Sequence, residues 1–170
     1  MGTRRWIMLV KLTTYELMIA AQVGVMRQVH NIKKGWINGH GLKDGQDWQL
    51  HIEGCCGEFA VAKALNLHWS GAVGNLDAAD VDGLEVRLRT KAHYSGAPAS
   101  LILHDRDSDG SMFILVVGLN GEYKLMGWIM GEEGKQKKFW SDPAGGRPAY
   151  FVPQKALYGI DLLVKNGDKT

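Results

Sequence analysis

The sequence predicts an α+β fold in which two N-terminal helices pack on a mixed or largely antiparallel sheet. Apolar residues recur at helical spacing over 13–32 and again over 49–67. From Val73 onward the pattern changes to short apolar or alternating runs, separated by turn residues, which is typical of strands. With 170 residues, 45% of them hydrophobic, the chain suits one domain with a sizeable core.

The first helix is predicted to begin at Thr13 or Thr14, because either hydroxyl can cap it, and Glu16 suits its first turn. A polar, glycine-containing stretch over 33–48 predicts a mobile loop with a turn at "NGHG". The second helix is predicted most strongly over "EFAVAKALNL".

Four strands are expected in the second half of the chain, over 84–90, 100–105, 112–119 and 122–131. The stretches "DRDSDGS" and "LNGEY" are predicted as hairpin turns between neighbouring strands. The tail combines a Gly/Pro-rich loop, a short extended piece and a final helical turn. The resulting division is an N-terminal helix and loop (1–49), a core (50–157) and a C-terminal tail (158–170), all within one compact domain.

Composition and charge argue against a disulfide-bonded secreted protein and a membrane protein, and they do not single out a function. The formal net charge of +2 is nearly balanced, so total charge does not indicate nucleic acid. The two cysteines are adjacent, which does not suggest a disulfide-bonded secreted protein. The apolar run near the start is too short for a signal peptide, and no run approaches the roughly 20 residues of a membrane span. We expect a soluble, cytoplasmic protein that does not enter a membrane.

The strand "LEVRLRT" carries the first candidate site. Because side chains alternate along a strand, Leu84 and Val86 face the core while Glu85 and Arg87 face the other way. Asp80 precedes the strand, where a turn can bring its carboxylate beside Glu85. Adjacent carboxylates repel unless a proton or a divalent cation joins them, and Mg²⁺ suits such oxygen ligands. An ordinary solvated edge strand is the alternative.

Glu58 is a second candidate, on the second helix. Its neighbours at helical spacing are small or apolar, so Glu58 lies on or beside the face that packs against the sheet. A buried carboxylate requires a partner. That partner is a metal site, the helix dipole or one of the arginines.

Taken in order, these residues resemble the PD-(D/E)XK nuclease superfamily, whose motif is a helix Glu, an Asp, and Glu-x-Lys on the next strand. The matching positions are Glu58, Asp80, Glu85 and Arg87. The stretches "GEFAVAKALNL", "ADVDGLEVRLRTK", "GWIMG" and "GGRPAYFVPQKAL" also look like small uncharacterised phage proteins thought to have this fold. The resemblance covers roughly residues 50–157.

The resemblance implies a restriction-endonuclease-like mixed sheet flanked by helices, and Mg²⁺- or Mn²⁺-dependent hydrolysis of DNA. Asp80 and Glu85 would bind the metal, Glu58 would assist directly or through water, and the motif's basic residue would position the attacking water. Arg87 replaces the usual Lys and cannot give up a proton, so it could only stabilise charge. That departure leaves room for an inactive member that binds DNA or protein. Many proteins with this fold are dimers, although no sequence feature here requires it.

Nucleic-acid binding also predicts basic residues near aromatic ones, which occur on the strand, in "GKQKKFW" and in "GGRP". Solvated lysines and core tryptophans are the alternative reading. The residues expected to contact phosphates are Arg89, Lys91, Lys135, Lys137 and Arg147.

Overall fold

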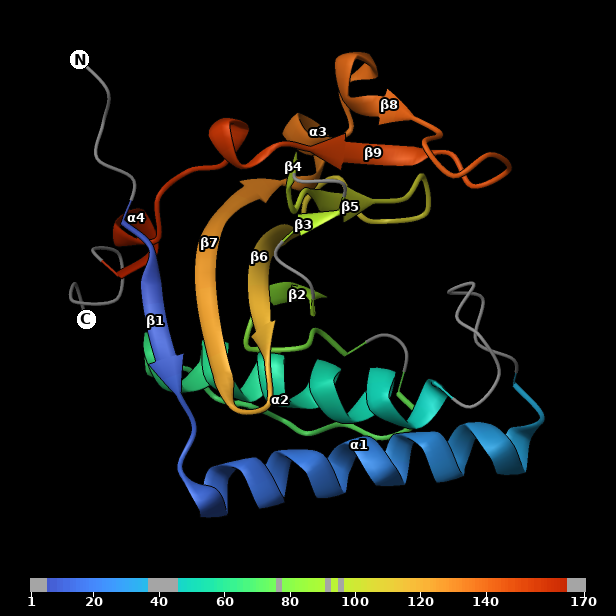
Figure 1. The fold of residues 1–170 in the computed structure, drawn as a ribbon, viewed down its shortest axis with the longest axis vertical. Helices are drawn as coiled ribbons and strands as arrows, with labels where there is room; N and C mark the ends of the chain where they lie inside the picture. Colours follow the sequence, from blue (N-terminus) through green and yellow to red (C-terminus); the bar gives the residue numbers. More distant parts are fainter. Residues whose placement is uncertain (1–5, 37–45, 76–77, 91–92, 95–96, 165–170) are drawn as a thin grey trace.

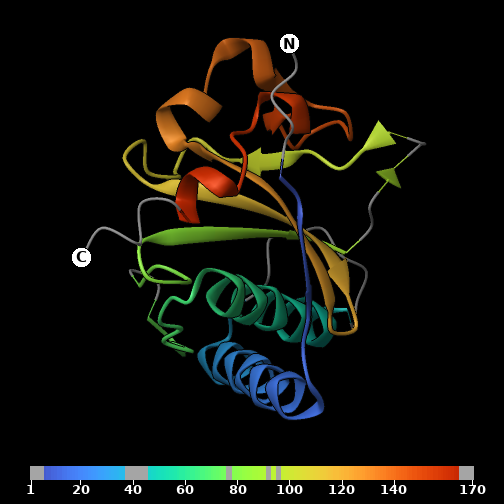
Figure 2. The same ribbon diagram turned by 90° about the vertical axis from the view of Figure 1, so that its left-hand side faces the viewer.

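Two long helices lie side by side below a curved four-stranded sheet, and a smaller sheet lies on the opposite side of it (Figures 1 and 2). The structure is a computed structural model that describes residues 6–36, 46–75, 78–90, 93–94 and 97–164. It is a single α+β domain with a mixed sheet flanked by helices, which confirms the predicted fold class at that level. Among the described residues, no helix is long and apolar enough to cross a membrane.

In chain order, the main elements are β1 (Met8–Lys11), α1 (Thr14–Lys34), α2 (Asp47–Leu65), β2 (Leu84–Arg89), β3 (His93–Tyr94), β4 (Ala97–Pro98), β5 (Leu101–Leu103), β6 (Met112–Leu119), β7 (Glu122–Met130) and β8 (Trp140–Ser141). The remaining ones are α3 (Gly131–Gly134), η1 (Lys137–Phe139), β9 (Ala149–Val152), η2 (Gln154–Ala156) and α4 (Asp161–Val164).

Both predicted helices are confirmed, and α1 begins as expected. The Thr13 hydroxyl accepts a hydrogen bond from the Glu16 N–H at 3.3 Å, and the Glu16 carboxylate accepts one from the Thr13 N–H at 2.7 Å. This capping box satisfies two N–H groups that the first turn leaves unpaired. The helix ends at Gly35, whose φ of 67° is left-handed. The expected turn "NGHG" lies outside the described residues.

The sheet has the order β1-β7-β6-β2, with β2 parallel to β6 and the other pairs antiparallel. Asn120 and Gly121 connect β6 to β7 with φ values of 55° and 88°, the signature of a tight hairpin turn, so this predicted hairpin is confirmed. β1 was not predicted, because its four residues give too short a pattern. The predicted loop, extended piece and helical turn of the tail are also present.

The second predicted hairpin, "DRDSDGS", is wrong. The strand before it, β5, pairs with β9 in the three-stranded sheet β5-β9-β8, whereas the strand after it, β6, belongs to the four-stranded sheet. The segment therefore connects two sheets. Turn residues show that the chain changes direction, but the packing of the flanking strands decides whether those strands pair.

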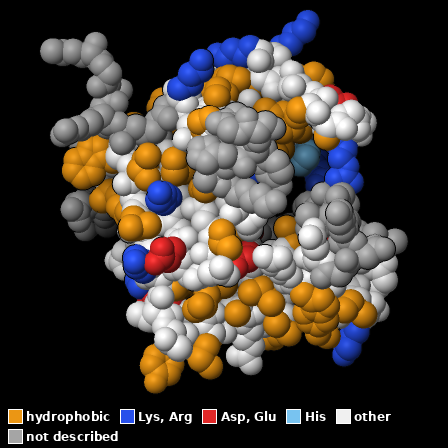
Figure 3. Space-filling view, in the orientation of Figure 1, with side chains coloured by type: hydrophobic (Ala, Val, Ile, Leu, Met, Phe, Trp, Pro, Cys, Tyr) orange, Lys and Arg blue, Asp and Glu red, His pale blue; other side chains and the backbone are white. Residues whose placement is uncertain are grey.

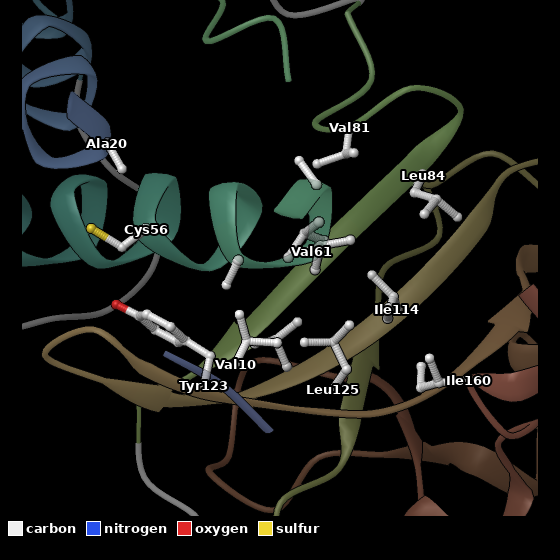
Figure 4. Packing of buried hydrophobic residues seen from close by; sticks show 14 residues of the cluster. Val10, Ala20, Cys56, Val61, Val81, Leu84, Ile114, Tyr123, Leu125 and Ile160 are labelled. Atoms are coloured by element: carbon white, nitrogen blue, oxygen red, sulfur yellow. The ribbon is translucent and has the colours of Figure 1, made fainter. Parts of the chain in front are cut away.

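The core lies on both faces of the central strand β6. Ile114 and Val116 face α2, whereas Phe113 and Leu115 face the smaller sheet. This explains why β6 is a continuous apolar run. Figure 4 shows the α2 side, where Val61, Leu125 and their neighbours fill the space between helix and sheet. α1 packs on α2, which in turn packs on the sheet, so only the second predicted helix lies directly against it.

Close packing of α1 on α2 depends on Gly24. A Cβ atom at this position would lie 2.5 Å from the Ile52 Cα atom of α2. No side chain can be accommodated at that distance unless one helix moves.

We therefore expect Gly24→Ala to lower the free energy of unfolding by about 1–3 kcal/mol, because the overpacked backbone must shift. Urea denaturation measures this loss. Gly54→Ala is the matched control: it lies inside α2, a Cβ there meets nothing within 4 Å, and alanine favours helix, so its stability should be equal or higher. Equal stability of Gly24→Ala and Gly54→Ala would contradict this account of the helix crossing.

Candidate functional site

The candidate site lies along the free edge of the four-stranded sheet, beside β2. A tight turn runs from Val81 to Leu84, with the Val81 N–H donating to the Leu84 carbonyl at 3.1 Å and Gly83 at a φ of 79°. This turn places the Asp80 carboxylate where it accepts the Val86 N–H at 2.8 Å. Asp80 therefore occupies a backbone N–H of the edge strand. Unpaired N–H groups on an edge strand can pair with the strand of another chain.

Glu85 and Arg87 lie on the same face of β2, as predicted. Arg87 Nη1 is 3.7 Å from Glu85 Oε2, and Arg87 Nη2 is 3.1 Å from Asp107 Oδ1. The guanidinium also lies over the Phe113 ring, 4.8 Å from its centroid. Asp107 in turn accepts the His104 N–H at 2.8 Å. Arg87 is thus held by Glu85, Asp107 and Phe113, and its side chain remains partly exposed.

Glu58 is buried and has an arginine partner, one of the alternatives that the sequence left open. Its two oxygens accept from Arg27 Nη1 at 2.6 Å and Nη2 at 2.9 Å. Trp69 Nε1 donates to the same carboxylate at 2.9 Å, and Arg27 Nε donates to the Ala72 carbonyl at 2.8 Å. The pair joins α1, α2 and the segment after α2.

The sequence did not identify Arg27 as the partner of Glu58 or Asp107 as the partner of Arg87, although it held a signal for Arg27. Arg27 is the only Lys, Arg, Asp or Glu between Leu17 and Ile32, on a largely apolar helix. A lone charge of this kind indicates a specific partner. Asp107 gave no such signal, because the aspartate-rich run around it is equally typical of a turn.

The predicted metal ligands are brought to one region, but they do not form a ready-made cage. Among the described residues, no group of three Asp, Glu, His or Cys side chains is arranged to hold a metal ion. Both Glu58 oxygens are already bonded to Arg27. Asp80 and Glu85 remain, and this pair fits Mg²⁺, which commonly takes one or two carboxylates and completes its shell with water and phosphate oxygens.

Negative charge exceeds positive charge around Asp80. Three carboxylates (Glu58, Asp80 and Glu85) lie near two guanidinium groups (Arg27 and Arg87), an excess of one negative charge when all are ionised. Burial raises the pKa of Asp80 to about 7, and the neighbouring Glu58 and then Glu85 add to this, while the Val86 N–H and Arg87 oppose it. A proton or a cation is therefore favoured at this carboxylate.

Cys55, one turn before Glu58, is not an activated nucleophile. Its side chain is fully buried, and burial, reinforced by Glu58, raises the pKa of its thiol to about 12. A thiolate is the reactive form of cysteine, so a thiol in this environment is inert near neutral pH.

The residues predicted to contact phosphates lie in different parts of the structure. Lys135 forms an ion pair with Asp109 and donates to the Asp107 carbonyl at 2.7 Å, so it holds the segment between the sheets. Lys137 and Arg147 are exposed, and Figure 3 shows Lys and Arg side chains along the upper rim, over the smaller sheet. Arg89 is partly buried beside the Ser100 carbonyl. Lys91 lies outside the described residues.

The Arg27–Glu58 pair should contribute strongly to stability. Arg27→Met leaves the Glu58 carboxylate buried without its cation and should cost about 3 kcal/mol, whereas adding Glu58→Gln should recover most of that loss. Urea denaturation of the two single variants and the double variant gives the coupling. As a control, Lys11→Met breaks the exposed pair with Glu122 and should leave stability nearly unchanged. Similar losses in Arg27→Met and Lys11→Met would show that the buried pair is not coupled.

Asp80 should make stability depend on pH. Its folded pKa of about 7 lies above the ordinary 3.8, so its favourable contribution is complete below pH 4 and is lost as pH rises to 7. Relative to Asp80→Asn, the wild-type free energy of unfolding should fall over this range by on the order of 3 kcal/mol, at about 1.4 kcal/mol per pKa unit. Urea denaturation at several pH values measures it, with the exposed Asp82→Asn as a control that keeps the wild-type slope. Parallel curves for wild type and Asp80→Asn would refute it.

Comparison of the chain with protein-family models, curated proteins and solved structures finds no match.

Proposed function

We propose that the protein is a Mg²⁺- or Mn²⁺-dependent nuclease that hydrolyses phosphodiester bonds in DNA, built on a restriction-endonuclease-like, phage-type fold. The observation that carries the proposal is the buried Asp80 carboxylate beside β2, on which Glu58 and Glu85 both act as negative charges and Arg87 as a positive one. The order Glu58, Asp80, Glu85 and Arg87 along the chain supports it, because it follows the PD-(D/E)XK motif.

Asp80 and Glu85 would hold the metal ion through their carboxylate oxygens. When bound, the ion would lower the pKa of a coordinated water and neutralise phosphate charge. Asp80 suits this role because the Val86 N–H fixes one of its oxygens. Burial and the neighbouring carboxylates also make its negative charge unfavourable unless a cation binds to it. Glu58 would act through its charge, which lies near Asp80, while its oxygens stay bonded to Arg27.

Arg87 would stabilise the negative charge that develops on the phosphate in the transition state. Asp107 and the Phe113 ring hold its guanidinium in place, so little reorganisation accompanies the reaction. An arginine does not exchange its proton near neutral pH, so Arg87 would not act as a base. Exposed Lys137 and Arg147, together with Arg89 and Lys91, would contact phosphates farther along the DNA.

A protein that binds DNA without cutting it is the second candidate. Arg87 stands where the motif has a lysine, and its side chain is already engaged by Asp107 and Glu85. Glu58 is likewise fully paired with Arg27. These contacts favour a site in which the basic residues bind phosphates and no group takes up a proton from water.

Calorimetric titration with Mg²⁺ and Mn²⁺ tests the metal site directly. We expect saturable binding to the wild type, loss of at least tenfold in affinity for Asp80→Asn, and unchanged affinity for Asp82→Asn, whose exposed carboxylate lies two residues away. The same three proteins are then incubated with supercoiled, linear and single-stranded DNA and Mg²⁺. Cleavage by wild type and Asp82→Asn, but not by Asp80→Asn, is the expected result.

Two outcomes separate the candidates. If the wild type binds no metal and cuts no DNA, yet binds labelled DNA in the presence of EDTA and loses affinity on Lys137→Ala with Arg147→Ala, the non-cutting protein is correct. Full cleavage by Asp80→Asn would exclude the proposed mechanism, whatever the DNA affinity.

A further inference from the structure

The outward face of α1 carries exposed apolar residues near both ends of the helix and in its second half. Its inward face, with Ala20, Gly24 and Gln28 buried, packs on α2. Seven apolar residues on the opposite side are between 37% and 78% exposed, and we refer to them as the α1 stripe. They are Tyr15, Met18, Ile19, Val25, Met26, Val29 and Ile32. Hydrophobic side chains line the lower edge of the molecule in Figure 3, over α1.

The spacing of the α1 stripe is that of a helix-pairing surface. Its members lie on one side of the helix in two groups, Tyr15 to Ile19 and Val25 to Ile32, and the exposed, uncharged Gln22 lies between these groups. Between Tyr15 and Ile32 the only Lys, Arg, Asp or Glu residues are Glu16 and Arg27, and both side chains are paired within the chain, Glu16 with Lys63 and Arg27 with Glu58. Surfaces that stay in water carry charges, whereas the centres of protein interfaces are depleted of them.

The α1 stripe is also large enough for a stable complex. With reference areas of about 160–220 Å² for these residue types, the exposed fractions amount to about 700 Å² per copy. Two such surfaces would bury about 1,400 Å², within the range of stable protein–protein interfaces. A shallow groove of about 570 Å³, lined by Tyr15, Met18, Ile19, Ala21, Gln22 and Val25, gives side chains of a partner a place to insert.

We propose that the α1 stripe binds the same stripe of a second copy of this chain, with the two helices antiparallel. The stripe is its own best complement, since any partner must offer a similarly long, uncharged apolar surface, and a two-fold axis brings two identical patches together. An axis near Val25 and Met26 buries the whole stripe. This inference goes beyond the proposed function, because none of the proposed metal ligands belongs to the stripe.

The charges at the helix ends favour the antiparallel arrangement. Glu16 lies in the first turn of α1, and Lys33 and Lys34 lie in the last turn. Glu16 is already paired with Lys63 of its own chain at 2.7 Å. The antiparallel preference therefore comes from the two helix dipoles, which such a pair opposes, and from the lysines of the two copies, which it keeps at opposite ends. A parallel pair would instead bring four lysines together at one end.

Light scattering after size-exclusion chromatography tests the dimer. At tens of micromolar, the wild type should have twice the 18.8 kDa mass of one chain. Met18→Glu combined with Met26→Glu should give the monomer mass, because Met26 lies near the axis and the carboxylates introduced there in the two copies would be buried against each other. Leu162→Glu, an equally non-conservative change on exposed α4, should stay dimeric. Circular dichroism checks that each variant is folded, as expected for changes at exposed side chains.

Cysteine cross-linking tests the orientation. Met26→Cys lies near the proposed axis and should form an intermolecular disulfide under mild oxidation. Tyr15→Cys should not, because antiparallel copies of this residue are about 30 Å apart along the helix axes. The native Cys55 and Cys56 are buried and do not compete.

A monomeric wild type at 100 μM, or a dimer that persists in Met18→Glu with Met26→Glu, would overturn the proposal. Cross-linking of Tyr15→Cys with none at Met26→Cys would overturn the antiparallel geometry. A wild type that is monomeric but floats with phosphatidylcholine–phosphatidylglycerol vesicles would assign the α1 stripe to a membrane surface instead.

Discussion

The buried pair between Arg27 and Glu58 is the interaction on which the rest of the structure depends. It joins α1 to α2 with two short hydrogen bonds, and Arg27 and Trp69 tie the segment after α2 to the same carboxylate. That segment leads into the turn that positions Asp80. A buried charge without its partner is strongly unfavourable, so the pair fixes both helices and the approach of the chain to β2.

The consequence for function is a concentration of carboxylates at a sheet edge. Burial raises the pKa of Asp80, and the nearby Glu58, held by Arg27, raises it further. On the other side, Arg87 is drawn to Asp107 and Glu85. The site therefore has an arginine at each end and, between them, the Asp80 carboxylate, whose environment favours a positive partner. Such an arrangement suits a divalent cation and a phosphate.

Helix α1 has a different role on each of its faces. The inward face carries Gly24, which permits close contact with Ile52, and Arg27, which supplies the charge. The outward face carries seven exposed apolar residues and the uncharged Gln22. Self-association through that face would hold α1 from both sides and would leave the edge of β2 open to a ligand.

The sequence by itself determined the α+β class, both long helices with the Thr13 cap, the hairpin at Asn120, and the alternation along β2, because each depends on local propensity and periodicity. It also placed Asp80 and Glu85 near each other, since only four residues separate them. Tertiary structure decided which strands pair, so that the segment after β5 joins two sheets. It also decided that Glu58 binds Arg27, because that choice depends on how α1 crosses α2, which no local pattern specifies.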